Sequence, residues 1–172
     1  MKRRIWAALV LVAVAASAGT ARATQATPSP GFKGTTLAMA TFGEINSHVI
    51  AEPGWQEKLQ THGRSDLFVQ QNTWDPVACK CVPSTGWHTH PGPSLVIVTQ
   101  GTVTEYDGDD PACTPHVYSA NTADNSFVDI GGGAVHIIRD ESGAPAQTVA
   151  VQLIPAGSNR RVDAPDPGNC SF

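Results

Sequence analysis

Short apolar runs rich in β-branched residues recur along the chain after residue 66. The runs are 67–69 (LFV), 95–98 (LVIV), 127–130 (FVDI), 135–138 (VHII) and 149–154 (VAVQLI). Their length and composition are typical of β-strands. Turn signals separate them, at 91–93 (PGP), 107–111 (DGDDP), 131–133 (GGG) and 142–145 (SGAP). Many short strands joined by turns that contain glycine and proline predict an all-β sandwich or barrel. A short helix is predicted at 53–60 (PGWQEKLQ), where polar residues separate Trp55 from Leu59.

The first residues have the pattern of a secretory signal peptide. Lys2, Arg3 and Arg4 precede an apolar run at 5–18, and small residues follow it. We predict a signal peptide at 1–23, cleaved between residues 18 and 23, and therefore export to a periplasm or to the medium. The alternative, an uncleaved membrane anchor, is disfavoured because the run is shorter than the ~20 residues that a membrane span needs.

Removal of the signal peptide changes the charge of the chain. The full sequence has a net charge of −4, with 11 basic and 15 acidic residues. Cleavage after Ala23 removes four basic residues and no acidic one, which leaves 7 basic residues and a net charge of −8. Nucleic-acid binding depends on clustered Lys and Arg, so an acidic domain argues against that class of partner. We expect a flexible lead-in at 24–35 and a single β-barrel domain at 36–172.

Four cysteines follow the signal peptide, namely Cys79, Cys81, Cys113 and Cys170. An even number in an exported protein favours disulfides, and four cysteines allow three pairings. We favour Cys113–Cys170, which would pin the C-terminal tail to the barrel, with Cys79–Cys81 as the second pair. A soft-metal site at Cys79 and Cys81 is the alternative, although their spacing is not that of a zinc knuckle.

Three of the six histidines form a candidate metal site. His88 and His90 are separated by one residue, so that in an extended strand their side chains point to the same side. His136 lies within an apolar strand, shortly after the glycine turn at 131–133. Two imidazoles on one strand face and a third on another strand predict a three-histidine metal chelate.

Two segments resemble the paired motifs of the cupin superfamily. They are GWHTHPGPSLVIVTQG (86–101) and DIGGGAVHIIRD (129–140). The resemblance covers roughly residues 66–156 and implies a double-stranded β-helix, or jelly-roll barrel. In that fold both motifs lie on neighbouring strands, so that His88, His90 and His136 converge. The whole chain is also similar to small exported bacterial cupin-domain proteins to which we can attach no activity.

One departure from the cupin pattern affects the chemistry. The acidic ligand of the first motif would fall near Pro93 or Ser94, and neither is a carboxylate. The resemblance then implies three neutral histidines that hold one divalent transition metal, with Fe, Zn, Mn, Ni and Cu not distinguished. Such a site resembles that of the iron(II) thiol dioxygenases and diketone-cleaving dioxygenases, and it is equally compatible with hydrolytic zinc.

Four further residues are accessory candidates. Gln70 or Gln71 should face the same cavity, because alternation turns one of the two inwards. Ser94 occupies the position of the missing ligand, and Glu105, on the following strand, is a candidate replacement for the carboxylate. No general base is evident, so the catalytic residues are unknown.

Three hypotheses about function remain. The first is a metal-dependent oxygenase, hydrolase or isomerase that acts on a small organic substrate, with dioxygenase-like chemistry favoured. The second is a non-enzymatic small-molecule or metal-binding protein of the cell envelope. The third is a disulfide-pinned barrel whose histidines bind nothing. A homodimer through edge strands is expected by analogy with cupins.

Overall fold

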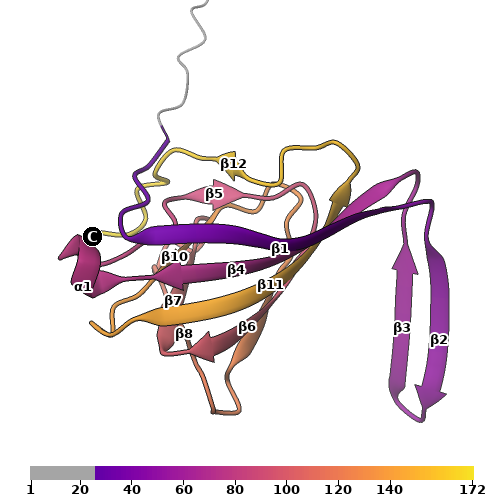
Figure 1. The fold of residues 1–172 in the computed structure, drawn as a ribbon, viewed down its shortest axis with the longest axis horizontal. Helices are drawn as coiled ribbons and strands as arrows, with labels where there is room; N and C mark the ends of the chain where they lie inside the picture. Colours follow the sequence, from indigo (N-terminus) through magenta and orange to yellow (C-terminus); the bar gives the residue numbers. More distant parts are fainter. Residues whose placement is uncertain (1–25) are drawn as a thin grey trace, which may run out of the picture.

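The computed structural model describes residues 26–172, and the predicted signal peptide at 1–23 lies outside this range. Nearly every element is a strand (Figure 1). The elements are β1 (Phe32–Phe42), β2 (Asn46–Glu52), β3 (Trp55–Gln60), β4 (Ser65–Trp74), α1 (Pro76–Cys79), β5 (His88–Thr89), β6 (Ser94–Gln100), β7 (Thr102–Asp107), β8 (His116–Ser119), β9 (Ser126–Asp129), β10 (His136–Arg139), β11 (Ala146–Pro155) and β12 (Val162–Asp163).

Two five-stranded sheets form the barrel. Their strand orders are β1-β4-β11-β6-β9 and β12-β5-β10-β7-β8. Apart from the β7–β8 hairpin, successive strands from β4 to β11 alternate between the two sheets. All of the strand pairs are antiparallel. This is the strand order of a jelly roll, in which two sheets close around a common interior. The prediction of an all-β, double-stranded β-helix is therefore confirmed.

Alternation along the strands decides which side chains enter the barrel. In β6, Val96 and Val98 are buried, whereas Leu95 and Ile97 between them are exposed. The same alternation runs through β11, where every second residue is buried. The main apolar core lies between the two sheets and consists of Trp74, Val96, Val98, Val103, Phe127, Ile138, Ala146 and Ala150. A second cluster contains Trp87, Tyr106, Ile137 and Ala164.

The helix predicted at 53–60 is wrong, because this segment forms strand β3. A turn at Gly54, with a φ of 89°, reverses the chain, and β3 then pairs antiparallel with β2. Isolated helices shorter than about 12 residues are marginal in water. The pattern of Trp55 and Leu59 also fits a strand, because both face the same side of the hairpin as their neighbour Glu57. The hairpin projects from one end of the barrel (Figure 1).

The lead-in predicted at 24–35 overlaps the first strand. β1 begins at Phe32, and residues 32–35 pair with β4 between Gln71 and Trp74. Hydrogen bonds to β4 order these four residues. The local composition, from which a flexible segment is predicted, does not indicate that a partner strand is present. Among residues 26–172, no helix is both long enough and apolar enough to cross a membrane.

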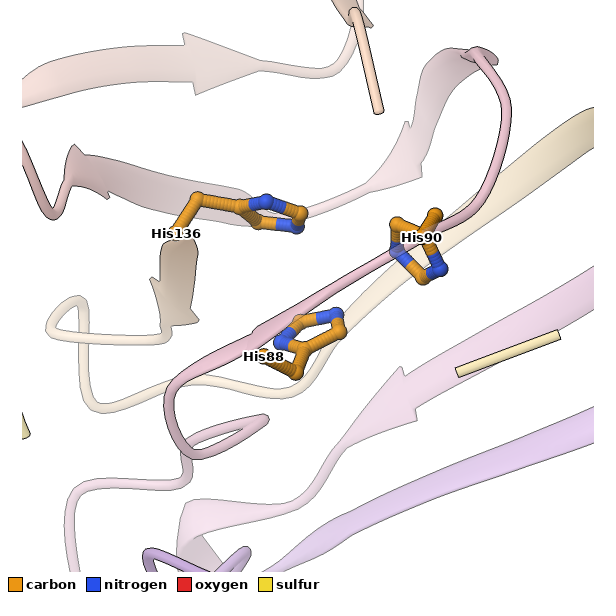
Figure 2. A group of neighbouring side chains, drawn as sticks. All are labelled: His88, His90 and His136. Carbon is orange, nitrogen blue, oxygen red and sulfur yellow. The ribbon is translucent and has the colours of Figure 1, made fainter. Parts of the chain in front are cut away.

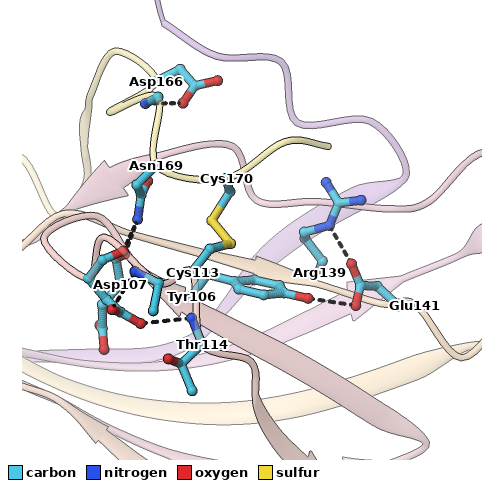
Figure 3. The surroundings of a disulfide bond; sticks show 12 residues. Tyr106, Asp107, Cys113, Thr114, Arg139, Glu141, Asp166, Asn169 and Cys170 are labelled. Carbon is cyan, nitrogen blue, oxygen red and sulfur yellow. Dashed lines mark hydrogen bonds and ion pairs between the residues drawn. A yellow bond between two sulfur atoms is a disulfide. The ribbon is translucent and has the colours of Figure 1, made fainter.

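Both predicted disulfides are present. Cys79 is bonded to Cys81 at the end of α1, and Cys113 is bonded to Cys170, 57 positions later. Figure 3 shows the second bridge, which joins the C-terminal tail to the loop after β7. The Asn169 side-chain amide also donates to the carbonyl groups of Asp107 and Asp110. The tail is therefore attached to the barrel covalently and by hydrogen bonds.

Candidate metal centre

Two of the three histidines come from β5 and the residue that follows it. His88 begins β5, and His90 stands one residue after its end. The rings of His88 and His90 lie 4.8 Å apart between centroids, in an edge-to-face arrangement. Both rings point into the barrel, and both residues are buried, with 4% and 9% of their surface exposed. The intervening Thr89 is less buried, as strand alternation requires.

His136 completes the group from the neighbouring strand. It begins β10 and is the direct cross-strand partner of His88. Its ring centroid lies 4.4 Å from that of His88 and 5.3 Å from that of His90. One ring nitrogen from each histidine lies within 4.8 Å of those of the other two. Figure 2 shows the three rings turned toward a common point. The structure therefore brings together the three histidines that the sequence singles out.

Backbone carbonyl groups orient two of the rings. His88 Nδ1 lies 2.9 Å from the carbonyl oxygen of Gly86, and His90 Nδ1 lies 2.7 Å from that of Arg160. A carbonyl oxygen can only accept, so Nδ1 of each ring carries the proton and Nε2 keeps its lone pair. The His136 ring also bonds to the backbone of Ala134. This arrangement, in which the backbone fixes the ring and frees the other nitrogen, is the one found around metal-bound histidines.

Burial keeps the imidazoles neutral. Desolvation, and then the neighbouring His136, lowers the pKa of His88 well below its ordinary value. Desolvation also lowers the pKa of His90, partly opposed by its bond to the Arg160 carbonyl and by Asp129. For His136, desolvation lowers the pKa to about 4, against an opposing effect of Asp129. Because a metal binds the unprotonated ring, all three ligands are ready at neutral pH.

Asp129 is a member of the site that the sequence analysis missed. It ends β9, is 5% exposed, and lies directly across the strand pair from Ser94, where the first motif lacks its carboxylate. Its Oδ2 atom lies 3.3 Å from His90 Nε2 and 3.7 Å from His136 Nε2. The available signal was its position: Asp129 opens the second motif, two residues after Phe127 on a strand that alternates. The pairing of β9 with β6 brings Asp129 to the site, and the local sequence does not specify which strand β9 pairs with.

The residues fit a divalent transition metal. Imidazole nitrogens suit iron, zinc, copper and nickel, and carboxylate oxygens are common additional ligands of such ions. Asp129 Oδ2 is buried and has no hydrogen-bond partner in the part of the chain described here. A buried acceptor without a partner is costly, and a cation would satisfy it.

Polar side chains line the barrel interior beside the histidines. Gln70 and Ser94 both face this cavity, whereas Gln71 points to the other face and bonds to Gln147. Gln70 accepts a hydrogen bond from Arg160, and Ser94 accepts one from Gln152 at 3.1 Å. The cavity is small, about 40 Å³. This volume holds water molecules and not a large substrate.

A second, larger cleft meets the site from outside. It has a volume of about 360 Å³, and its walls include Asp129 and His136, which also line the inner cavity. Glu105 lies in this cleft, beside Asp107, and is 8% exposed. Desolvation, followed by the charges of Asp107 and Asp129, raises the pKa of Glu105 to about 8. Glu105 therefore lies next to the site, in the cleft that shares Asp129 and His136 with the inner cavity.

Three other polar or aromatic residues within or near the two motifs lie outside the site. Asp140 accepts hydrogen bonds from the backbone and hydroxyl of Ser142, so it stabilises a turn. Trp87 is buried in the second apolar cluster, on the side opposite to His88. His116 is exposed and lies 3.7 Å from Asp107, at the rim of the outer cleft.

No protein-family model matches the chain, and no curated protein matches it. Similar solved structures include a cupin superfamily protein from Desulfitobacterium hafniense DCB-2, at 10% identity and a TM-score of 0.40, over 70% of this chain and 81% of that one. A cupin domain from Bordetella pertussis Tohama I has 16% identity and a TM-score of 0.43, over 73% and 96%. An oxalate oxidase in complex with the substrate analogue glycolate has 16% identity and a TM-score of 0.40, over 52% and 46%.

Two properties of the chain itself define its fold. The order of its strands is that of a jelly roll, and the two histidine-bearing segments lie on adjacent strands that line one barrel. By its strand order, this chain is a double-stranded β-helix, or jelly-roll barrel, whose interior holds the three histidines.

Proposed function

We propose that this chain is an exported metalloprotein that binds one divalent transition metal at His88, His90 and His136 and acts on a small organic substrate. The observation that carries the proposal is the convergence of three buried, neutral imidazoles, of which His88 and His90 have their Nδ1 atoms engaged by backbone carbonyl groups. Burying three rings with their lone pairs facing one another has no evident structural benefit. An ion that accepts all three lone pairs accounts for the arrangement.

Each group of the chain has a defined part in this proposal. The histidines hold the ion, and the carbonyl groups of Gly86 and Arg160 keep two of the rings oriented. The bound ion supplies Lewis-acid chemistry, or, if it is iron, oxidation chemistry with O₂. We favour dioxygenase-like activity because the motif resemblance implies a three-histidine centre with positions left open for a small substrate. The small inner cavity excludes bulk water from the inner side of the ion.

Metal content is the first test. The protein, purified without chelators, should contain close to one equivalent of a divalent transition metal by elemental analysis. His88→Ala and His136→Ala should lose that metal, because each removes one of three ligands. His62→Ala, at an exposed position outside the barrel interior, is the matched control and should retain it. Absence of metal from the wild-type protein, including after incubation with iron(II) and zinc, would contradict the proposal.

Turnover is the second test. Oxygen uptake should be measured with the iron-loaded protein and a panel of small thiols and diketones, and hydrolysis of small esters with the zinc-loaded protein. Activity that disappears in His136→Ala and persists in His62→Ala would support an enzyme. Stoichiometric metal binding without turnover across the panel would instead favour the second candidate, a metal-binding or small-molecule-binding protein of the cell envelope.

The size of the inner cavity supports keeping this second candidate. About 40 Å³ leaves no room for an organic substrate inside the barrel. A substrate must then approach through the outer cleft, past Asp129 and His136, or the ion is held without turnover.

Export and self-association belong to the same proposal. The signal-like sequence at 1–23 supports export, and the two disulfides suit an oxidising compartment. Exposed apolar side chains on the outer face of the first sheet, namely Leu95, Ile97 and Val128, support a homodimer. Light scattering coupled to size-exclusion chromatography should report twice the mass of the mature chain, and the mass of one chain would contradict it.

A further inference from the structure

Asp129 is fixed at the end of β9 by its own turn. Its Oδ1 atom accepts a hydrogen bond of 2.8 Å from the backbone amide of Gly131. The turn thereby holds one carboxylate oxygen and sets the direction of the other. Because β9 pairs with β6 so that Asp129 faces Ser94, the side chain enters the barrel at the level of the histidines.

The second oxygen, Oδ2, faces two of the three histidines. It lies 3.3 Å from His90 Nε2 and 3.7 Å from His136 Nε2. His90 Nε2 is free to bind an ion, because the other ring nitrogen, Nδ1, is bonded to the Arg160 carbonyl group. Two donor atoms that share an ion at about 2.1 Å each lie roughly 3.0–3.4 Å apart when they are adjacent. The distance from Oδ2 to His90 falls in this range, and the distance to His136 is slightly longer.

The surroundings of Oδ2 favour the binding of a cation beside it. The atom is buried and has no hydrogen-bond partner in residues 26–172. Its side-chain contacts of ion-pair type within residues 26–172 are those to His90 and His136, and no Lys or Arg forms an ion pair with it, so no full positive charge contacts it. A divalent ion at the histidines would supply that charge at contact distance.

We propose that Asp129 Oδ2 is a fourth protein ligand of the ion held by His88, His90 and His136, so that the ion has three histidine ligands and one carboxylate ligand. The inference rests on the proposed function, because it requires the histidines to hold an ion. Its consequence is a lower net charge on the occupied site, +1 in place of +2 for a divalent ion. Such a site binds its metal more tightly and attracts small external anions less strongly than three neutral ligands do.

The test replaces the carboxylate without disturbing the turn. In Asp129→Asn the side-chain oxygen can still accept from the amide of Gly131, whereas the charge and the second acceptor are lost. Asp140→Asn is the matched control. Asp140 is 1% exposed and also has an Oδ2 atom without a partner, but its other oxygen binds Ser142, and it does not line the site. Thermal unfolding of the metal-free proteins verifies that each variant is folded.

Two readouts distinguish a ligand from a structural residue. Zinc affinity, measured by competition with a chromophoric chelator, should fall by about 10- to 100-fold in Asp129→Asn. The visible absorption bands of the cobalt(II) form should also shift, because the set of donor atoms changes. Asp140→Asn should match the wild-type protein in both measurements. An Asp129→Glu variant, which keeps the charge, should bind zinc more tightly than Asp129→Asn does.

The outcomes separate the two proposals. If wild-type protein binds no metal, the proposed function fails, and the inference about Asp129 fails with it. If wild-type protein binds metal, and Asp129→Asn binds zinc equally well with an unchanged cobalt spectrum, the histidines hold the ion alone and only the inference is overturned. An equal loss of affinity in Asp129→Asn and Asp140→Asn would also overturn it, because the effect would then come from general destabilisation.

Discussion

At the scale of single residues, ordinary backbone groups prepare the histidines for an ion. Gly86 and Arg160 accept the Nδ1 protons of His88 and His90, and burial prevents the rings from gaining a second proton. The ligands therefore do not have to release protons when metal binds at neutral pH. The ring orientation is set before the ion arrives, which reduces the conformational entropy that binding must overcome.

Glu105 should make the metal-free protein less stable as the pH rises. Its pKa is about 8 in the folded chain, above the 4.5 of an unperturbed carboxyl group, so the folded state holds an extra proton between these values. Burial of Glu105 therefore costs no stability below pH 4.5, where its carboxyl group is protonated in both states. As the pH rises toward 8, the free energy of unfolding falls by up to about 1.4 kcal/mol per pH unit because of this group. Glu105→Gln cannot ionise at this position, so this pH-dependent loss is absent. The variant should therefore become more stable relative to wild type as the pH rises from 5 to 8.

Chemical denaturation at the two pH values measures this difference. Glu52→Gln, at an exposed position on β2, is the control and should follow the wild-type pH dependence. An identical pH dependence in Glu105→Gln and wild type would show that Glu105 ionises normally in its cleft.

The sequence sufficed for some of these residues and not for others. His88 and His90 were predictable because alternation in a strand is a local rule, and His136 because its motif follows in the expected order. Alternation also predicted that one of Gln70 and Gln71 faces inwards, but only the observed sheet shows that it is Gln70. Asp129 was not predictable, because it joins the site through the pairing of β9 with β6, and the local sequence of either strand does not specify its partner.

At the scale of elements, the turn at 131–133 connects Asp129 to His136. Gly131 has a φ of 64° and Gly132 a φ of 66°, in the left-handed region that favours glycine. The two positions differ in their surroundings. A Cβ atom on Gly131 would overlap the carbonyl group of Gly92, whereas one on Gly132 would meet nothing within 4 Å. The turn and the loop before β6 are therefore in close backbone contact.

Alanine substitutions at these two glycines should have unequal effects. Gly132→Ala should lower the free energy of unfolding by roughly 1–2 kcal/mol, because only the backbone conformation is disfavoured. Gly131→Ala carries the same conformational cost and also a steric overlap, which adds a further ~1–3 kcal/mol. It should also weaken zinc binding, because the amide of residue 131 holds Asp129. Denaturant titration and chelator competition measure the two effects, and equal destabilisation by both substitutions would contradict this account.

The wrong helix prediction at 53–60 has its cause at this scale too. An apolar residue at every fourth position satisfies both a helix face and a strand face, so Trp55 and Leu59 did not discriminate. What decides the structure is a neighbour, β2, which offers backbone groups from Asn46 to Glu52. The hydrogen bond of 3.1 Å from the Ser47 hydroxyl to Glu57 adds a cross-strand contact that the segment alone does not reveal.

At the scale of the whole molecule, the disulfides differ in what they constrain. Cys113–Cys170 closes a loop with a sequence separation of 57, whereas Cys79–Cys81 closes one with a separation of 2. In the chain-entropy account, stabilisation grows with the length of the loop, to about 4 kcal/mol for one of this larger size. The pairing was predictable because the tail cysteine had one distant partner available once the adjacent pair was joined.

Removal of the long-range bridge should therefore destabilise the protein more. We expect the double variant Cys113→Ser/Cys170→Ser to lose about 2–4 kcal/mol of unfolding free energy. Cys79→Ser/Cys81→Ser should lose much less, because a short loop restricts the unfolded chain little. Denaturant titration under non-reducing conditions compares the two. A larger loss in the Cys79/Cys81 variant would show that this bridge has a role in the folded state that loop length does not describe.

The position of Arg160 has a consequence for how the protein is made. Its carbonyl group orients His90, and β12, which follows it, pairs with β5 across Thr89 and His88. Segments near the end of the chain thus complete a site whose first two ligands are translated some 70 residues earlier. Translation must pass residue 163 before the ion can be held as described here, so metal loading follows the synthesis of β12 and does not start when the first two ligands emerge.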